Sequence, residues 1–108
     1  MILNCRQPDG KTVKIRLKAI SGAPPVSVGR GKEATIQVDD VKCSRIHCAI
    51  RYWEDVFCIR DMNSSNGTFL NDKQIDIAYL RPGDKVRIGN TEFELEAEAT
   101  GSEVTMVG

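Results

Sequence analysis

Three separated segments of the chain carry side chains that could bind an oxyanion. In the first, Arg30 follows Gly29 at the end of an apolar stretch, so a guanidinium with a planar fork of N–H donors would project from a turn. In the second, Ser44 offers a hydroxyl and a backbone N–H beside the cation of Arg45. Residues 42–51 around them hold three cations and one histidine but no acid, in a chain without net charge. These donors predict a cradle for a phosphate group.

The third segment, residues 61–68, is rich in side chains that can hydrogen-bond to their own backbone. Every position except Met62 is polar or turn-forming, which is more than a tight hairpin connection requires. Two asparagines and Gly67 tolerate left-handed backbone conformations, so the loop can be rigid without being buried. A rigid loop would present Ser65 and Asn66 to a ligand at a low entropic cost.

These segments must be held by β-strands, because the sequence shows no sustained helical period and no internal repeat. Apolar and polar residues alternate in short stretches, as in residues 13–18 and residues 92–97. Further apolar stretches lie between turn-forming residues, at positions 26–28, 35–38, 48–53, 56–59 and 86–88. The pattern predicts a single all-β domain, an antiparallel sandwich or barrel.

The same alternation produces two charged rows. Lysine and arginine occupy positions 14, 16 and 18, and glutamate occupies positions 92, 94 and 96. The rows could face each other on adjacent strands, where each opposed pair would contribute about 0.2 to 1 kcal/mol. They could equally be two unrelated solvated faces.

The composition excludes several classes of function. Fifteen basic residues balance 15 acidic residues in 108, so the chain has no global attraction to nucleic acid or to an anionic membrane. No apolar run approaches the roughly 20 residues of a membrane helix, and residues 1–6 lack a secretory signal, which predicts a cytoplasmic protein. Residues 99–108 have no pattern to bury and are expected to be a flexible tail or linker. Free, mostly buried thiols are expected at all four cysteines, Cys5, Cys43, Cys48 and Cys58.

The ordered set of motifs resembles the forkhead-associated (FHA) domain from about residue 2 to residue 96, nearly the whole chain. Each fragment is weak alone, but their order and spacing are specific. The motifs are Gly29-Arg30, Ser44-Arg45-Ile46-His47, Ser64-Ser65-Asn66-Gly67-Thr68 with Asn71, and then Leu80, Gly83-Asp84 and Ile88. The resemblance implies a twisted antiparallel β-sandwich of about eleven strands over residues 1–98, with its binding loops clustered at one end.

The resemblance also implies a non-catalytic, phosphothreonine-dependent module for binding peptides and proteins in Ser/Thr kinase signalling. Arg30 would contact the phosphate, Ser44 would donate its hydroxyl to it, and Arg45 would make an auxiliary contact. Asn66 would hydrogen-bond the peptide main chain, and Ser65 and Asn71 would complete the binding site. The positions that would support the loops are Gly29, His47, Gly67 and Thr68, with His47 tying the loops together from beneath.

The implied partner is a phosphothreonine-containing protein, either a Ser/Thr kinase or a kinase substrate. The resemblance implies no cofactor, metal, nucleic acid or membrane, and the protein is expected to be a monomer. Thr100 and Thr105, if phosphorylated, could reach the pocket of the same chain or of a neighbouring chain.

Three positions depart from the family pattern. Asn63 stands where glycine is usual, but asparagine also tolerates positive φ. Ser65 replaces a more frequent threonine and keeps the hydroxyl. Asp72 follows Asn71 where glycine is common, and an acid near the expected peptide path would disfavour acidic residues after the phosphothreonine.

A metal or thiol-catalytic site is one alternative, because Cys43, His47 and Cys48 lie close in sequence and could ligate zinc with Cys5 or Cys58. On an alternating strand, however, His47 and Cys48 point to opposite faces.

Two further alternatives concern binding. An FHA-like scaffold or dimerisation domain could work without phosphate, although the intact Arg30, Ser44 and Asn66 argue against it. Binding to nucleic acid is disfavoured by the zero net charge.

Overall fold

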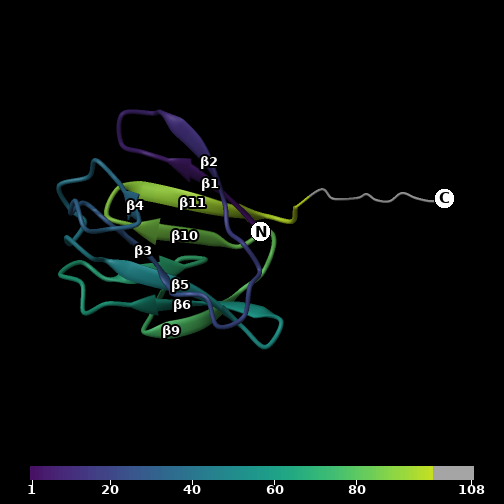
Figure 1. Cartoon of the computed structure of the whole chain (residues 1–108). Helices are drawn as coiled ribbons and strands as arrows, with labels where there is room; N and C mark the ends of the chain where they lie inside the picture. Colours follow the sequence, from purple (N-terminus) through teal and green to yellow (C-terminus); the bar gives the residue numbers. More distant parts are fainter. Residues whose placement is uncertain (99–108) are drawn as a thin grey trace.

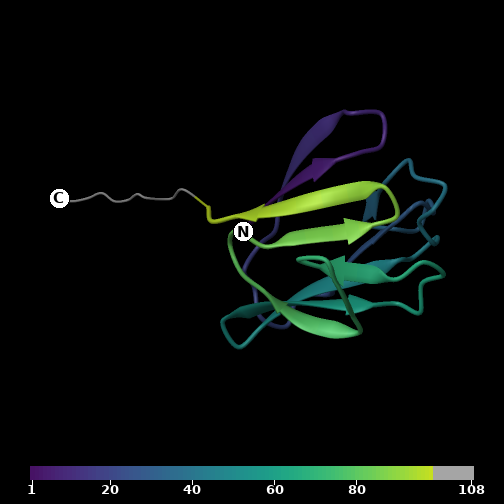
Figure 2. The same ribbon diagram turned by 180° about the vertical axis from the view of Figure 1, so that it is seen from behind.

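The computed structural model describes residues 1–98, which form two β-sheets packed face to face (Figure 1; Figure 2 shows the same ribbon from behind). The predicted all-β sandwich of about eleven strands is confirmed. The strands are β1 (Ile2–Arg6), β2 (Thr12–Arg16), β3 (Val26–Gly29), β4 (Ile36–Gln37), β5 (Cys48–Trp53), β6 (Val56–Asp61), β7 (Thr68–Leu70), β8 (Lys73–Ile75), β9 (Ile77–Leu80), β10 (Lys85–Ile88) and β11 (Thr91–Glu96). The expected tail, with Thr100 and Thr105, lies outside the described residues.

The order of the strands explains why loops from distant parts of the chain meet. One sheet runs β2-β1-β11-β10-β7-β8 and the other runs β4-β3-β5-β6-β9. The pairing is antiparallel, as predicted, except that β3 and β4 pair in parallel, with Val28 opposite Ile36. Residues 30–35 fold back along β3, so the chain runs through β4 in the same direction. Both strands therefore end at the same edge of the sandwich, where residue 30 and residues 38–47 emerge together.

The core lies between the sheets and is built from the inward-facing half of each alternating pattern. Leu3, Val28, Ile59 and Ile88 are completely buried, and each such side chain contributes about 1.5 to 3 kcal/mol to folding. Three of the four free cysteines are buried as expected: Cys5, Cys43 and Cys48. Burial raises the pKa of the Cys5 thiol to about 11 and those of the Cys43 and Cys48 thiols to about 12, so these thiols are protonated and unreactive.

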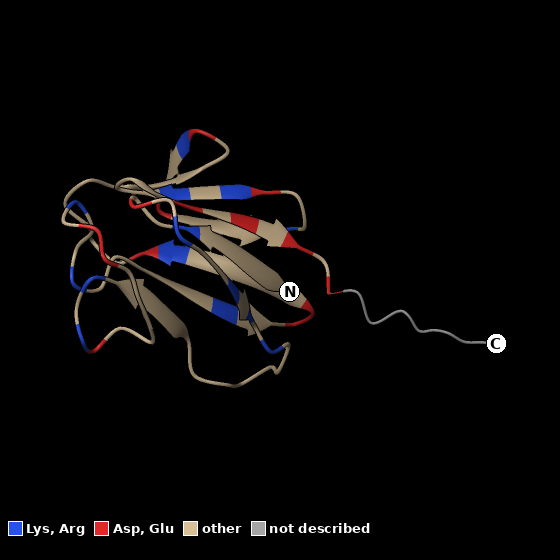
Figure 3. Ribbon diagram, turned by 90° about the horizontal axis from the view of Figure 1, so that it is seen from above, with Lys and Arg blue, Asp and Glu red and all other residues tan. Residues whose placement is uncertain are grey.

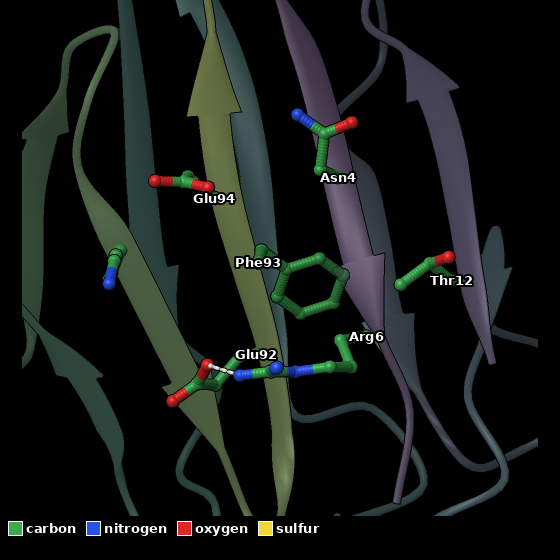
Figure 4. Close-up of a pocket in the computed structure, with 7 residues that line it drawn as sticks. Asn4, Arg6, Thr12, Glu92, Phe93 and Glu94 are labelled. Carbon is green, nitrogen blue, oxygen red and sulfur yellow. Dashed lines mark hydrogen bonds and ion pairs between the residues drawn. The ribbon is translucent and has the colours of Figure 1, made fainter. Parts of the chain in front are cut away.

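The two charged rows do not lie on adjacent strands, because β1 separates β2 from β11. Figure 3 shows basic (blue) and acidic (red) segments distributed over the strands of the sandwich. Lys14 still reaches across β1 to Glu96, at 3.8 Å, and Arg6 on β1 pairs directly with Glu92 at 2.8 Å. Figure 4 shows this second pair in a shallow pocket on the outer face of the sheet. These ion pairs are exposed, so each contributes little to stability.

Within residues 1–98 there is no helix of the length and apolarity needed to cross a membrane.

Candidate phosphate-binding site

Arg30 leaves the end of β3 and is held by the backbone of the loop that follows β4. Its backbone N–H donates to the Ser44 carbonyl at 3.0 Å, and its side-chain Nε donates to the Cys43 carbonyl at 2.8 Å. Neither Nη group has a hydrogen-bond partner among residues 1–98, and the side chain is exposed. The Nε bond orients the plane of the guanidinium, so the two Nη groups form a fixed pair of donors for a ligand.

Two glycines allow this close approach of Arg30 to the neighbouring loop. A Cβ atom at Gly29 would collide with the Arg45 carbonyl and come within 2.8 Å of the Ser44 oxygen. Gly31 donates its backbone N–H to the Arg45 carbonyl at 3.0 Å. A side chain at position 29 would push Arg30 away from Ser44, which gives Gly29 a physical role in the loops.

His47 joins two loops from within the core. The imidazole is fully buried; its Nδ1 accepts the Ser44 backbone N–H at 3.0 Å, and its Nε2 lies 2.8 Å from the Gly67 carbonyl. Because Nδ1 accepts and a carbonyl can only accept, the network assigns the proton to Nε2. The Ser44 N–H is thus already used, contrary to the prediction that it would be available to a ligand. Both ring nitrogens are occupied as well, which leaves neither for a metal ion.

The side chains of Ser44 and Asn66 connect the remaining parts of the site. The Ser44 Oγ accepts the Ser65 backbone N–H at 3.0 Å, which leaves the hydroxyl proton of Ser44 to be donated elsewhere. The Asn66 Nδ2 donates to the Lys42 carbonyl at 2.7 Å. Residues 42–44 therefore hold Arg30 on one side and the loop containing Ser65 and Asn66 on the other.

Arg45 does not point freely toward a ligand. Its Nη2 donates to Glu33 Oε2 at 2.8 Å, and both side chains are largely exposed. The hydrogen bond from Arg45 holds the pKa of Glu33 below its ordinary value. Glu33 could not be singled out from the sequence, because Arg45 becomes adjacent to it only after residues 30–35 fold back.

Asp61 and Ser64 order the loop between β6 and β7. One Asp61 oxygen accepts the hydroxyls of Ser64 and Thr68 at 2.6 and 2.7 Å, and the Ser64 Oγ accepts the Gly67 N–H at 2.9 Å. Desolvation opposes the ionisation of Asp61, but these donors outweigh it and the pKa lies below the ordinary value. Asn63 adopts a φ of 58°, so it tolerates the backbone conformation expected of the usual glycine.

Asp40 is a buried acid whose role was not predicted from the sequence. Its carboxylate accepts the Lys42 N–H at 3.0 Å, the Asn90 N–H at 2.8 Å and the Thr91 hydroxyl at 2.7 Å. Desolvation raises the pKa of Asp40, but these hydrogen bonds outweigh it and hold the pKa below the ordinary value. Asp40 thereby fixes the carbonyl groups of residues 42 and 43, which accept from Asn66 and Arg30. A sequence pattern could indicate only one of these contacts, the hydrogen bond from the Lys42 N–H, because aspartate often accepts from the backbone N–H two residues further along the chain.

The structure brings Arg30, Ser44, Ser65 and Asn66 together, but it does not bring Asn71 to them. Asn71 follows β7 at the end opposite Gly67. Its carboxamide donates to Asp84 and accepts the Lys85 N–H, both at 3.0 Å. Asp72 lies in the same distant turn, away from the loops that would hold a peptide.

The assembled site offers a guanidinium with two free Nη groups, a hydroxyl proton from Ser44 and the exposed side chains of Ser65 and Asn66. The N–H of Arg45 has no partner within the described part of the chain. Among residues 1–98 there is no group of three or more His, Cys, Asp or Glu side chains that could hold a metal ion. The arrangement is chemically suited to a tetrahedral oxyanion.

Comparison with known proteins gives a consistent result. A profile of the FHA domain matches residues 26–89, which is more than half of the chain. The glycogen accumulation regulator GarA of Mycolicibacterium smegmatis is 41% identical over 66 residues, or 61% of this chain and 42% of that protein. The FHA domain of CT664 from Chlamydia trachomatis is similar with a TM-score of 0.80 and 27% identity, over 91% of this chain and 97% of that one.

Another solved structure comes from an analysis of phosphothreonine-dependent FHA domain interactions. It has a TM-score of 0.72 and 29% identity, and it covers 92% of this chain and 99% of that one. The chain thus spans nearly all of these solved domains but less than half the length of GarA.

Proposed function

Because the chain belongs to the FHA family, we propose that it is a non-catalytic module that binds phosphothreonine in extended segments of partner proteins. The observation that carries this function is the joining of Arg30, Ser44 and Asn66 through the backbone of residues 42–44. Three loops that are far apart in sequence thereby direct unlike donors to one place.

The phosphate is required because it supplies the charge that these donors match. A phosphothreonine brings about −1.5 to −2 charges and three acceptor oxygens, whereas threonine has one hydroxyl. Hydrogen bonds to charged groups contribute about 1.5 to 3 kcal/mol each, so two or three of them decide whether a peptide binds. In this proposal Arg30 and the Ser44 hydroxyl bind the phosphate directly.

The other site residues would hold the peptide rather than the phosphate. Asn66 keeps its carboxamide oxygen for a main-chain N–H of the ligand, and Ser65 lies beside it with an exposed side chain. Arg45 would reach the phosphate only after leaving Glu33. Asn71 is left out of this binding set, since its carboxamide is already satisfied at the far end of β7.

The partner would be a phosphothreonine-containing Ser/Thr kinase or a kinase substrate, in keeping with the relatives' place among phosphothreonine-dependent and regulatory proteins. Such a role would place the protein in the cytoplasm. The balance of charges supports neither nucleic acid nor an anionic membrane as the ligand.

The function is tested by calorimetric titration with a phosphothreonine peptide and its unphosphorylated twin, taken from a peptide-library selection. We expect only the phosphorylated peptide to bind, and Arg30→Ala to abolish the difference. Arg30→Lys keeps the charge but loses the fork and the Nε bond, so it should recover only part of the affinity. Arg60→Ala removes an exposed arginine from the outer face of β6 and serves as the control. Equal affinity for the two peptides would favour a phosphate-independent scaffold.

A further inference from the structure

The four edge strands of the two sheets are not equally protected. β2 carries Lys14 and Arg16, β8 carries Lys73, and β4 has only two residues. β9 has four residues, Ile-Ala-Tyr-Leu, and no charge. Charged side chains are a common means of preventing edge-to-edge pairing, and β9 carries none. In Figure 1 β9 is the outermost strand at the lower border of the molecule.

The outer face of β9 also carries two exposed apolar side chains, although Arg60 of β6 lies opposite one of them, Ile77. Ile77 is 65% exposed and Tyr79 is 63% exposed, the largest values for any hydrophobic side chain on a strand among residues 1–98. Tyr79 also lines a shallow hollow, whose other residues are Trp53, Glu54, Val56, Cys58, Leu80 and Arg81. Pairing along this edge would cover Ile77 and Tyr79 and remove apolar surface from water.

The backbone groups of Ile77 and Tyr79 point to the open edge. Asp61 donates its N–H to the carbonyl of Asp76, which lies directly opposite it, at 2.8 Å. Hydrogen-bonded and non-bonded pairs alternate along an antiparallel ladder, so Ala78 and Leu80 are the β9 residues bonded to β6. The N–H and C=O groups of Ile77 and Tyr79 must therefore face away from β6.

We propose that the open edge of β9 is a dimerisation surface for a second copy of this chain. Antiparallel pairing about a twofold axis through Ala78 places Ile77 of one copy opposite Tyr79 of the other, twice. All the outward-facing backbone groups of Ile77 and Tyr79 then form hydrogen bonds, and each isoleucine side chain packs on a tyrosine ring. If the register between the two strands shifted by one residue, the outward-facing backbone groups of one copy would lie opposite inward-facing groups of the other. A shift by two residues would leave only one hydrogen-bonded pair.

The dimer leaves phosphate binding unobstructed. The axis is perpendicular to the sheet, so the two candidate sites lie at opposite ends of the assembly and both remain open. The inference goes beyond the proposed function and does not depend on it. Two four-residue strands bury less than the roughly 1,200 Å² of a stable protein interface, so the dimer is expected to be weak and concentration-dependent.

Sedimentation equilibrium of the 108-residue chain, from micromolar to millimolar concentration, tests the surface. We expect a reversible dimer, and Ile77→Lys should weaken it at least tenfold without changing the affinity for a phosphothreonine peptide. Ile20→Lys makes the same change at a residue that is 54% exposed in a loop, and it should leave the dimer intact.

Either of two results would overturn the inference. One is a monomer at every concentration, and the other is a dimer that Ile77→Lys does not weaken. If the protein stays monomeric while Ile77→Lys weakens the binding of a whole phosphorylated protein but not of a short peptide, the surface belongs to the partner instead.

The register is tested by cross-linking. In the proposed dimer Ala78 lies opposite Ala78 of the second copy in a non-hydrogen-bonded pair. The Cα atoms of such a pair are about 4.5 Å apart, so cysteines placed at both positions can form a disulfide. Under copper phenanthroline, which takes up the two electrons, Ala78→Cys in a Cys58→Ser background should cross-link quickly. Tyr79→Cys in the same background faces Ile77 and should cross-link slowly. Equal rates for the two variants would rule out this register.

Discussion

Two asparagine-containing turns lie at opposite ends of β7 and use their side chains in different ways. The Asn71 carboxamide donates to Asp84 and accepts from Lys85, in the turn that precedes β10, so neither end of the carboxamide is left for a ligand. Asn66 donates to Lys42 in a distant loop and keeps its oxygen exposed. Each asparagine therefore joins two turns, but only Asn66 keeps an acceptor available.

The same contrast holds for the wider ends of the sandwich. At the end that carries the proposed binding site, buried groups on His47 and Asp40 hold loops from different parts of the chain, and the half-buried Asp61 orders the loop that follows it. Holding the loops before the ligand arrives reduces the entropy that binding must offset. The two ends therefore differ in which donors and acceptors their polar contacts leave unused.

Replacing His47 should have the largest effect, because it removes the contact that joins two binding loops. His47→Ala leaves the Ser44 N–H and the Gly67 carbonyl buried without a partner, and we expect a loss of about 3 to 5 kcal/mol in the free energy of unfolding. Urea denaturation followed by tryptophan fluorescence measures it. At a urea concentration where the variant is folded, phosphopeptide affinity should also fall. A loss under about 1 kcal/mol would mean that the loops hold together without the imidazole.

Replacing each asparagine separately tests the comparison directly. Asn66→Ala should lower phosphopeptide affinity about tenfold, or 1.4 kcal/mol, since the main-chain contact to the ligand is lost. Asn71→Ala should leave affinity unchanged but reduce the free energy of unfolding by about 1 to 2 kcal/mol, because two hydrogen bonds disappear and alanine is strained at a φ of 49°. Titration calorimetry and urea denaturation on both variants measure the two effects. A fall in affinity for Asn71→Ala would place that residue back in the binding site.

Alternating strands and turn residues predicted an all-β sandwich or barrel, because both are local signals. The resemblance to the FHA domain predicted that the loops carrying Arg30, Ser44 and Asn66 would meet. It placed Asn71 among the binding residues since a motif gives spacing along the chain but not the end of the strand at which a residue falls. Asp40 and Glu33 went unrecognised for a related reason. Their partners, Thr91 and Arg45, become neighbours only in the folded sandwich.

Acidification should disturb the binding end. The carboxyls of Asp40 and Asp61 have pKa values below the ordinary range in the folded protein, so their ionised forms contribute stability above about pH 4. That contribution is lost as the pH falls through the lower pKa values of the folded state. Amide hydrogen exchange should show early loss of protection at Lys42, Ser64 and Asn90, ahead of the central strands. Asp40→Asn should remove the pH dependence at Lys42 and Asn90, and uniform loss across the sandwich would contradict the expectation.

The smallest effect on affinity is expected from replacing Glu33, which forms an ion pair with Arg45 and so keeps this arginine from a ligand. Arg45 is paired with a carboxylate that must be displaced before the guanidinium can reach a phosphate, and the displaced acid would then lie near the phosphate charge. Glu33→Gln should therefore raise phosphopeptide affinity a few-fold, about the range of an exposed ion pair, and the gain should shrink in high salt. Glu54→Gln, at an exposed turn between β5 and β6, is the control. A decrease in affinity for Glu33→Gln would show instead that the carboxylate positions Arg45 for binding.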